Sequence, residues 1–263
     1  MTPRGLLLDF GGVIVESTYN DDWHLKVADE LEKIFGDELA ACGIDRQRLE
    51  IDVFASETSV KLLRNAQARP LYSRDLSHTE YVLDYLSADW PASLHPKLAQ
   101  HADRICYLIA SLTENRVMRP GTVELLEWCK ERTIPVGIVS NALSGQVHRD
   151  WLMDAGILSY FTAEVYSDEV GVRKPDPRLV WIGAERIGVP VEECWYVGDH
   201  LDRDVLCGNR AGAGASVLMP APNAAKRPFK VFATPDVTVA DPAGLLEVLK
   251  ETCLLYTSDA ADE

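Results

Sequence analysis

Four groups of polar residues in the sequence together offer the chemical groups that phosphoryl transfer requires. They are Asp9, Ser140 with Asn141, Lys174, and Asp199 with Asp204. A carboxylate can act as a nucleophile, a hydroxyl and an amide can bind an anion, a lysine can neutralise that anion, and paired acids can hold a metal ion. Any one of these residues alone would more often be a turn residue, a helix cap or a solvated charge. Their combination predicts a site for phosphoryl transfer.

These groups stand at or near the ends of apolar segments of strand length. Such segments cover residues 4–8, 135–139, 163–167, 194–197, 215–219 and 237–239. Helical patterns separate them, at residues 122–132, 178–187 and 204–213, with a further helix through Trp151 and Met153. Strands that alternate with helices predict a doubly wound, parallel (Rossmann-like) α/β sheet. Because ligands bind outside the carboxyl ends of the strands in such a sheet, we expect the polar groups to meet there.

The long stretch between the first and second of these groups is helical in character. Helices are predicted from Trp23 to Ile34, over residues 51–65, from a capping box at Ser77–Glu80 through Leu86, and over residues 95–112. Trp23 lies on the apolar face of the first, which favours core packing over a stacking role. The predicted domains are therefore a core of residues 1–15 and 115–252 and an inserted α-helical cap of residues 16–114.

The composition excludes several classes of function. The chain of 263 residues has a formal charge of −15, and 47% of its residues are hydrophobic. It can therefore bury a core, and its acidic surface argues against partners such as nucleic acid or an anionic membrane. The six cysteines stand singly, which predicts buried thiols in a reducing compartment. No apolar run is long enough to span a bilayer or resembles a signal peptide, so we expect a cytoplasmic protein of unknown oligomeric state.

The last eleven residues, 253–263, need separate treatment. They read Cys-Leu-Leu-Tyr-Thr-Ser-Asp-Ala-Ala-Asp-Glu, which resembles the translation of a sequencing adapter. They follow a predicted final helix, residues 242–251, without a break or a cap. A short native polar tail is the alternative. We interpret 253–263 as an adapter-derived, non-native segment and leave it out of the predicted fold.

The polar groups belong to four short motifs that occur in order along the chain. They are Asp9-Phe-Gly-Gly-Val13, Val139-Ser-Asn141, Lys174-Pro-Asp-Pro177 and Gly198-Asp-His-Leu-Asp-Arg-Asp204. In this respect the sequence resembles the haloacid dehalogenase (HAD) superfamily, and the match extends from the N-terminus to about Leu249. The long helical insert resembles the helical cap of that family. One such motif would be weak support for the resemblance, whereas four in order are specific.

The resemblance implies a role for each group. Asp9 would attack phosphorus and form an aspartyl-phosphate intermediate, which divides one difficult displacement into two easier ones. The Ser140 hydroxyl and the Asn141 backbone amide would bind phosphoryl oxygens, and Lys174 would neutralise charge on both the nucleophile and the phosphate. The implied substrate is a small phosphorylated metabolite.

The resemblance also implies Mg²⁺ as the cofactor, an ion that prefers a few carboxylates together with water and phosphate oxygens. The implied protein ligands are Asp9, the carbonyl of Gly11, Asp199 and Asp204, the last directly or through a water molecule. We expect Asp202 to face solvent. We expect Asp176 to form a turn between two prolines and to take no part in the chemistry.

The sequence departs from the phosphatases of the family at Gly11, where they usually have an aspartate. The backbone carbonyl of glycine can still bind a metal ion, but glycine has no side chain that could protonate the leaving oxygen. Loss of general acid–base help typically costs about 10²–10⁴-fold in rate. The penalty should be largest for poor leaving groups such as simple alkoxides. Residues near the cap entrance or the fourth motif could supply a substitute acid, although for each of them a solvated role is the simpler interpretation: Glu16, Asp21, Asp22, His24 and His200.

Two other functions fit the same scaffold. One is a metal-independent 2-haloacid dehalogenase, in which Asp9 would attack carbon; the acidic fourth motif, with Asp199 and Asp204, favours the phosphatase. The other is a catalytically weakened binding or regulatory module, which only Gly11 supports. Substrate contacts would come from the cap, where basic and aromatic residues could meet an anion but are more simply interpreted as solvated side chains: Arg64, Arg69, Tyr72 and Arg74.

Overall fold

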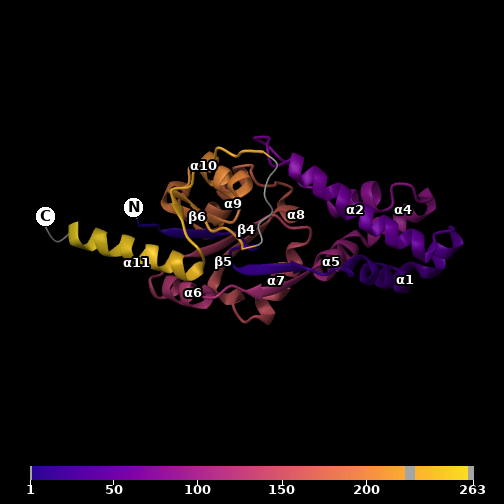
Figure 1. Ribbon diagram of the computed structural model, residues 1–263, viewed down its shortest axis with the longest axis horizontal. Coiled ribbons are helices and arrows are strands. Elements are labelled where there is room, and N and C mark those ends of the chain that lie inside the picture. The colour runs from indigo at the N-terminus through magenta and orange to yellow at the C-terminus, as the bar shows by residue number, and fades with distance from the viewer. Residues whose placement is uncertain (1, 223–228, 260–263) are drawn as a thin grey trace.

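The computed structural model describes residues 2–222 and 229–259, and its core is a six-stranded parallel sheet (Figure 1). The strands lie in the order β5-β4-β1-β6-β7-β8. Their bounds are β1 Gly5–Leu8, β4 Val136–Ser140, β5 Phe161–Tyr166, β6 Cys194–Gly198, β7 Ala215–Leu218 and β8 Val237–Thr238. The chain builds outward from β1 to β4 and β5, then returns to the other side of β1 with β6. This order confirms the predicted doubly wound fold, with the switch point beside β1.

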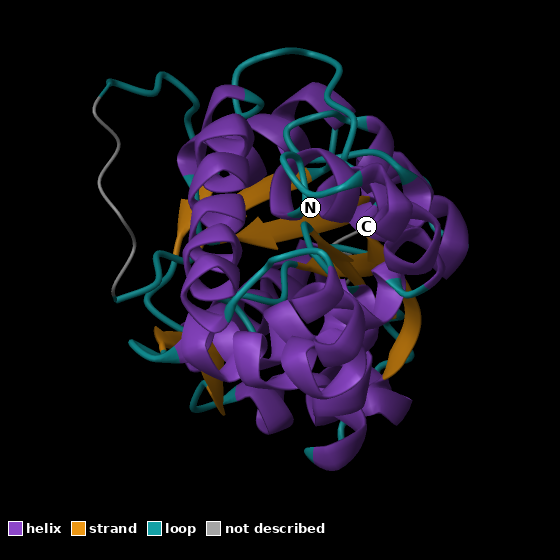
Figure 2. Ribbon diagram, turned by 90° about the vertical axis from the view of Figure 1, so that its right-hand side faces the viewer, coloured by secondary structure: helices purple, strands orange, loops and turns teal. Residues whose placement is uncertain are grey.

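Helices cover both faces of this sheet (Figure 2). Consecutive residues of β1 point to opposite faces: Leu6 and Leu8 join one hydrophobic cluster and Leu7 joins another. The first cluster includes residues of α6 (Thr122–Glu131), α7 (Gly145–Asp154) and α11 (Pro242–Asp259), and the second includes residues of α9 (Arg178–Ile187) and α10 (Leu206–Ala211). Short helical segments complete the core: η3 Leu158–Tyr160, α8 Ser167–Val170, η4 Val191–Glu193 and η5 Leu201–Val205.

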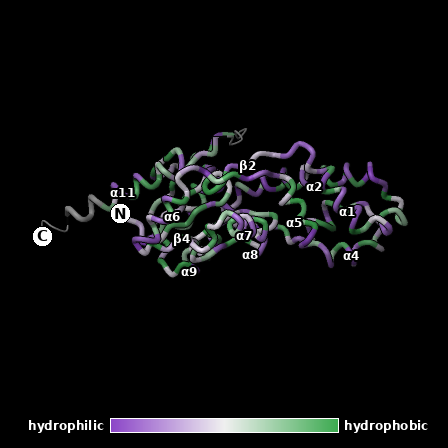
Figure 3. Tube along the Cα trace, turned by 90° about the horizontal axis from the view of Figure 1, so that it is seen from below, coloured by the Kyte–Doolittle hydropathy of each residue, from purple (hydrophilic) through white to green (hydrophobic). Residues whose placement is uncertain are grey.

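The inserted segment forms a helical unit at one end of the molecule (Figure 1). Its elements are α1 Trp23–Ala41, α2 Arg46–Ala66, α3 His78–Glu80, η1 Tyr81–Leu86, η2 Ala92–Leu94, α4 His95–Gln100 and α5 Ala102–Thr113. Hydrophobic and hydrophilic residues alternate along α1 and α2 (Figure 3), and the buried ones form a separate hydrophobic cluster. Trp23 lies in that cluster, as predicted. The capping box at Ser77 and Glu80 is present, although the helix it opens continues as a π-helix.

A two-stranded antiparallel ribbon, which the sequence analysis did not predict, joins the cap to the core. It pairs β2 (Val15–Tyr19) with β3 (Glu114–Met118), and Val15 lies opposite Met118. Each strand spans one of the predicted domain boundaries, at residues 15/16 and 114/115. The ribbon therefore belongs to both predicted domains.

Several predicted helices have different bounds in the structure. The helix predicted over residues 95–112 is interrupted at His101, between α4 and α5. The helix predicted from Asp204 begins earlier, as the single π-helical turn η5. The final helix was expected to end at residue 251, but α11 continues to Asp259. The helix thus enters the segment interpreted as adapter-derived, whose residues 260–263 lie outside the described part; its non-native origin stays a prediction.

The cysteines of the described chain are free thiols. Cys106, Cys129, Cys194 and Cys207 are buried, whereas Cys42 and Cys253 are partly exposed. The prediction of buried thiols is therefore confirmed for four of the six. Within residues 2–222 and 229–259, none of the helices combines the length and the apolar character that crossing a bilayer requires.

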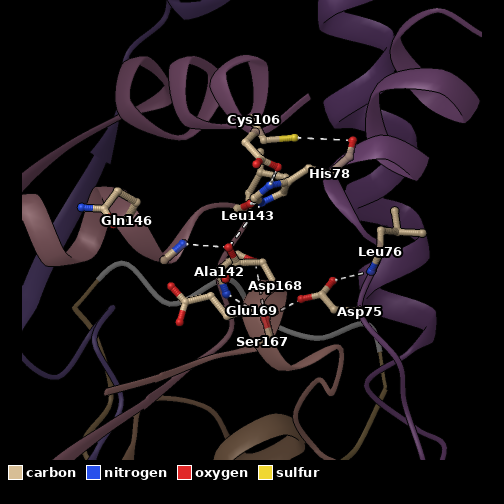
Figure 4. Close-up of polar contacts among 12 residues, drawn as sticks. Asp75, Leu76, His78, Cys106, Ala142, Leu143, Gln146, Ser167, Asp168 and Glu169 are labelled. Atoms are coloured by element: carbon tan, nitrogen blue, oxygen red, sulfur yellow. Dashed lines mark hydrogen bonds and ion pairs between the residues drawn. The ribbon is translucent and has the colours of Figure 1, made fainter. Parts of the chain in front are cut away.

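A polar cluster connects the cap to the core on one side of the molecule (Figure 4). Buried Asp75 of the cap accepts hydrogen bonds from Ser167 Oγ and, at 2.9 Å, from Arg173 Nη1. Beside it, the imidazole of His78 lies 2.7 Å from the Leu143 carbonyl oxygen and 3.3 Å from Asp168 Oδ2, both in the core. These bonds hold the two units together.

Candidate active site

The predicted site residues meet at the carboxyl ends of three neighbouring strands. Asp9 follows β1, Ser140 ends β4 with Asn141 next to it, and Asp199 follows β6. All four line one cleft, of about 400 Å³, between the sheet and the cap. Lys174 and Gly11 line the same cleft. The volume suits a small metabolite.

Lys174 occupies the centre of this arrangement. Its ammonium group lies 2.8 Å from Asp9 Oδ2 and 2.6 Å from Asp204 Oδ1, and it also donates to the Val139 carbonyl at 3.3 Å. The lysine side chain is 1% exposed, so its charge depends on these two carboxylates rather than on water. The nucleophile predicted from the sequence is therefore held by a buried cation.

Asn141 has a second role, which the sequence analysis missed. Its side-chain Oδ1 accepts the backbone N–H of Lys174 at 2.9 Å, and its Nδ2 donates to the Lys174 carbonyl at 3.3 Å. This pair of bonds fixes the backbone that carries the lysine. Only the Asn141 backbone amide had been assigned a role, because sequence alone does not show which distant backbone a side-chain amide will meet.

The charges of this group are strongly coupled. Burial raises the pKa of Asp9 to about 6; Lys174 opposes this shift, while Asp204 and Asp199 reinforce it. Burial also opposes ionisation of Asp204, but Lys174, Arg203 and His200 outweigh it and hold the pKa of that carboxyl well below its usual range. Burial likewise opposes the charge of Lys174, yet the two carboxylates raise its pKa. Asp204 is therefore the permanent counter-ion of Lys174, and Asp9 is the carboxylate with the higher affinity for a proton.

The oxygens of Asp204 are already engaged by the protein. Oδ1 accepts from the Tyr196 hydroxyl at 3.0 Å as well as from Lys174, and Oδ2 accepts from the His200 backbone N–H at 3.0 Å. Three donors therefore orient this buried carboxylate: Tyr196 on β6, His200 in the loop after β6, and Lys174 in the loop before α9. A metal ion at this site would share Asp204 with these donors.

The donor set fits a divalent cation. Ligand atoms of Asp199, His200 and Asp204 all lie within 4.8 Å of one another. Gly12, at φ +74°, makes room for Asp199, because a Cβ at this position would collide with that carboxylate. Carboxylate oxygens are the ligands that Mg²⁺ prefers. The cluster includes two of the four predicted ligands and adds His200, whose Nδ1 lies 2.5 Å from Asp199 Oδ1.

The prediction that Asp202 faces solvent is wrong, since its side chain is buried. The residue lies in the π-helical turn η5, and Asp202 and Asp204 are both buried there. Asp176 is structural, as expected: it accepts the backbone N–H of Arg178 at 3.0 Å. It also accepts the backbone N–H of Ser73 from the cap, at 3.1 Å.

Gly11 faces open space. A Cβ built on this residue has no neighbouring atom within 4 Å, so the position can accept a larger side chain. Of the substitute acids considered, Glu16 and His200 line the cleft, whereas Asp21, Asp22 and His24 are not among its lining residues. The Glu16 side chain is 43% exposed and lies 3.8 Å from Arg119 Nε.

The basic residues of the cap separate into two groups. Arg64 lines the cleft and is only 17% exposed, so its interpretation as a solvated charge is wrong. Arg69, Tyr72 and Arg74 are exposed, as expected, and Arg74 pairs with Glu80 at 2.8 Å. Arg64 was not distinguishable from the others by sequence, because its burial depends on how α2 packs against other elements of the cap.

Comparison with known proteins agrees with this geometry. Residues 3–212 match the haloacid dehalogenase-like hydrolase family, and the chain belongs to that family. It is 34% identical over 134 residues to a glyceraldehyde 3-phosphate phosphatase of Methanopyrus kandleri, with 50% of this chain and 56% of the relative covered. It is 31% identical over 122 residues to a phosphoserine phosphatase of Thermus thermophilus, covering 46% of this chain and 47% of the relative. The chain thus spans about half the length of these relatives.

The fold has solved counterparts in the same family. A 2-haloacid dehalogenase from Pseudomonas syringae pv. Tomato DC3000 superposes with a TM-score of 0.61. The alignment covers 95% of this chain and 99% of the other, at 16% identity. This similarity establishes a shared fold for cap and core together and leaves the choice of reaction to the site.

Proposed function

We propose that this protein is a Mg²⁺-dependent phosphohydrolase that acts on a small phosphorylated metabolite through an aspartyl-phosphate intermediate. The observation that supports it most is the position of Lys174, a lining residue of the cleft whose ammonium group lies between Asp9 and Asp204. A buried cation beside a nucleophilic carboxylate also attracts the oxygens of an incoming phosphate. The phosphatases among its relatives support the same reaction class.

In the proposed reaction, one oxygen of Asp9 forms a bond to phosphorus as the bond from phosphorus to the leaving oxygen breaks. The Ser140 hydroxyl and the Asn141 backbone N–H bind phosphoryl oxygens, and Lys174 offsets the charge that accumulates on them. A water molecule then attacks the phosphorus of the intermediate and releases phosphate and free Asp9.

We assign the cation site to Asp9, the Gly11 carbonyl, Asp199 and Asp204, with His200 as a neighbouring donor in the same cluster. Mg²⁺ held there would supply further positive charge to the phosphate oxygens. Asp9 must be ionised to attack, and the positive charge of Lys174 favours that form against the effect of burial.

Gly11 limits the range of efficient substrates. Because no side chain at this position can protonate the leaving oxygen, we expect the rate to depend strongly on the acidity of the leaving group. Acyl, aryl and anomeric phosphates should be better substrates than alkyl phosphates.

We also propose a cytoplasmic location, which the acidic composition and the free thiols support.

A substrate panel tests this function. Aryl, acyl, sugar and alkyl phosphates are assayed with Mg²⁺ or with a chelator, while halide release from 2-haloacids is followed in parallel. We expect Mg²⁺-dependent phosphate release that Asp9→Asn reduces by at least about 10⁴-fold. Metal-independent halide release would instead establish a dehalogenase. Absence of turnover, with Mg²⁺-dependent protection by phosphate analogues, would indicate a binding module.

A further inference from the structure

Part of the lining of the cleft comes from the cap and carries cations. Lys61 and Arg64 lie three residues apart on α2, so they occupy one side of that helix, and both line the cleft. Arg116 of β3 lines it as well. The chain as a whole carries a formal charge of −15, so these cations stand out against the overall charge, although Glu57 and Glu114 line the same cleft.

Arg64 is buried with incomplete compensation. Its Nη1 lies 3.6 Å from Glu57 Oε1, and its Nε has no hydrogen-bond partner among the described residues. Glu57 is shared, because its other oxygen accepts the Tyr81 hydroxyl at 3.1 Å. A guanidinium group has five N–H donors in a planar arrangement that matches the oxygens of an anion. The Nε–H donor of Arg64 is therefore available to bind such a ligand.

The ammonium group of Lys61 lies 4.9 Å from the centre of the Tyr19 ring, and no ion pair of Lys61 is found among the described residues. The other cations of the cleft wall have protein partners. Arg116 donates to the carbonyls of Ala110 and Glu114, and Arg173 pairs with Asp75. Lys61 and Arg64 are therefore the cap cations best able to bind a ligand.

We propose that Lys61 and Arg64 bind a second anionic group on the leaving-group part of the substrate. The inference rests on the proposed function and narrows it to phosphate esters whose alcohol carries a carboxylate or a further phosphate. Asp9 and Lys174 hold the reacting phosphate, and the α2 wall holds the second anion. Binding at both ends fixes the ester in one orientation, which lowers the entropic cost of reaching the transition state.

Three aryl esters test the proposal without changing the leaving group greatly. They are phenyl phosphate, 3-carboxyphenyl phosphate and 1,3-phenylene bisphosphate; a meta carboxylate has little effect on the acidity of the phenol. We expect kcat/KM to be about 10–100-fold higher for at least one of the doubly anionic esters than for phenyl phosphate, as charge-assisted hydrogen bonds would give. The two doubly anionic esters distinguish a carboxylate from a phosphate.

The variants Lys61→Met and Arg64→Met should each reduce that preference by about tenfold. The matched control is Lys33→Met, which removes an exposed lysine of α1 that pairs with Glu30 outside the cleft. The control should keep the wild-type preference. A wild-type ratio near one, or a ratio that both cleft variants retain, would overturn the proposal. Since Lys61 is exposed, Lys61→Met is expected to fold even if Arg64→Met does not.

A binding experiment separates this inference from the proposed function. Asp9→Asn protein with Mg²⁺ is titrated with phenylphosphonate and with 3-carboxyphenylphosphonate, and the two dissociation constants are compared. About tenfold tighter binding of the carboxylated compound, lost in Lys61→Met, supports the second anion site even if no ester is hydrolysed. Equal binding of both compounds contradicts it, even if phenyl phosphate is turned over.

Discussion

The two walls of the cleft are built differently. On the core side, Lys174, Asp9 and Asp204 are buried and joined to one another at 2.6–2.8 Å, with Asn141 and Tyr196 holding them in place. On the cap side, Lys61 is exposed and Arg64 has only a distant ion pair. A buried network whose polar groups are all hydrogen-bonded resists rearrangement. Charged side chains with unused N–H donors can instead reorient toward a ligand. The difference suggests that the sheet fixes the reaction and that the cap selects the substrate.

The core network can be broken most severely at Lys174. We expect Lys174→Met to lower kcat by about 10³-fold, because the nucleophile and the phosphate lose their shared cation. The same change should lower the free energy of unfolding by about 3–5 kcal/mol, since it leaves two buried carboxylates without a counter-ion. Kinetics and urea unfolding measure the two effects.

The matched control for this variant is Lys250→Met, which removes a partly exposed lysine paired with Glu247 on α11. Its activity and stability should be close to those of the wild type. If Lys174→Met kept the kcat of the wild type, the reaction would not require the positive charge of Lys174.

The sequence predicted the core wall better than the cap wall, for a physical reason. In a parallel sheet, the residue after each strand is brought to a common edge by backbone pairing alone, so Asp9, Ser140 and Asp199 could be placed without side-chain detail. The burial of Arg64 depends instead on how α2 packs against other elements of the cap, which no local sequence pattern shows. The ribbon of β2 and β3 was missed because its two strands are far apart in sequence and mostly polar.

The junction between the walls should be sensitive at Asp75. This carboxylate is buried between Arg173 and Ser167, and Arg173 is itself buried. Asp75→Asn leaves the guanidinium without a counter-ion, which should cost about 3 kcal/mol of stability in urea unfolding. Asp37→Asn, an exposed change on α1, is the control and should cost less than about 0.5 kcal/mol. A cost for Asp75→Asn as small as that of the control would mean that the junction does not rely on this pair.

A smaller, pH-dependent contribution comes from His78. Hydrogen bonding to Asp168 raises its pKa from 6.5 to about 9 against the effect of burial, and Asp103 and the Leu143 carbonyl add to the shift. The folded protein therefore binds the His78 proton more tightly than the unfolded chain does. The resulting stabilisation is fully present below pH 6.5 and is lost as the pH rises through about 9.

Urea unfolding of wild type and His78→Gln over a range of pH measures this contribution. We expect the variant to be less stable by about 1–2 kcal/mol at pH 6, after allowance for solvent screening at the exposed Asp103. The difference should disappear above about pH 9. His101→Gln, at a cap histidine whose ring packs edge-on against Phe35, is the control for removing an imidazole from the cap. A difference for His78→Gln that is constant with pH would contradict the assignment.

The proposed reaction depends most on Gly11, which stands at the position where phosphatases of the family usually carry a general acid. The measurement is kcat/KM for phosphate esters of graded leaving-group acidity, in wild type and in Gly11→Asp, for which the open space at this position leaves room. We predict a steep dependence in the wild type. In Gly11→Asp the dependence should be shallower, with about 10²-fold gain for the alkyl esters and little change for the most acidic aryl ester. A flat dependence in the wild type, unchanged by Gly11→Asp, would contradict the account and would mean that another residue of the cleft, such as Glu16 or His200, protonates the leaving group.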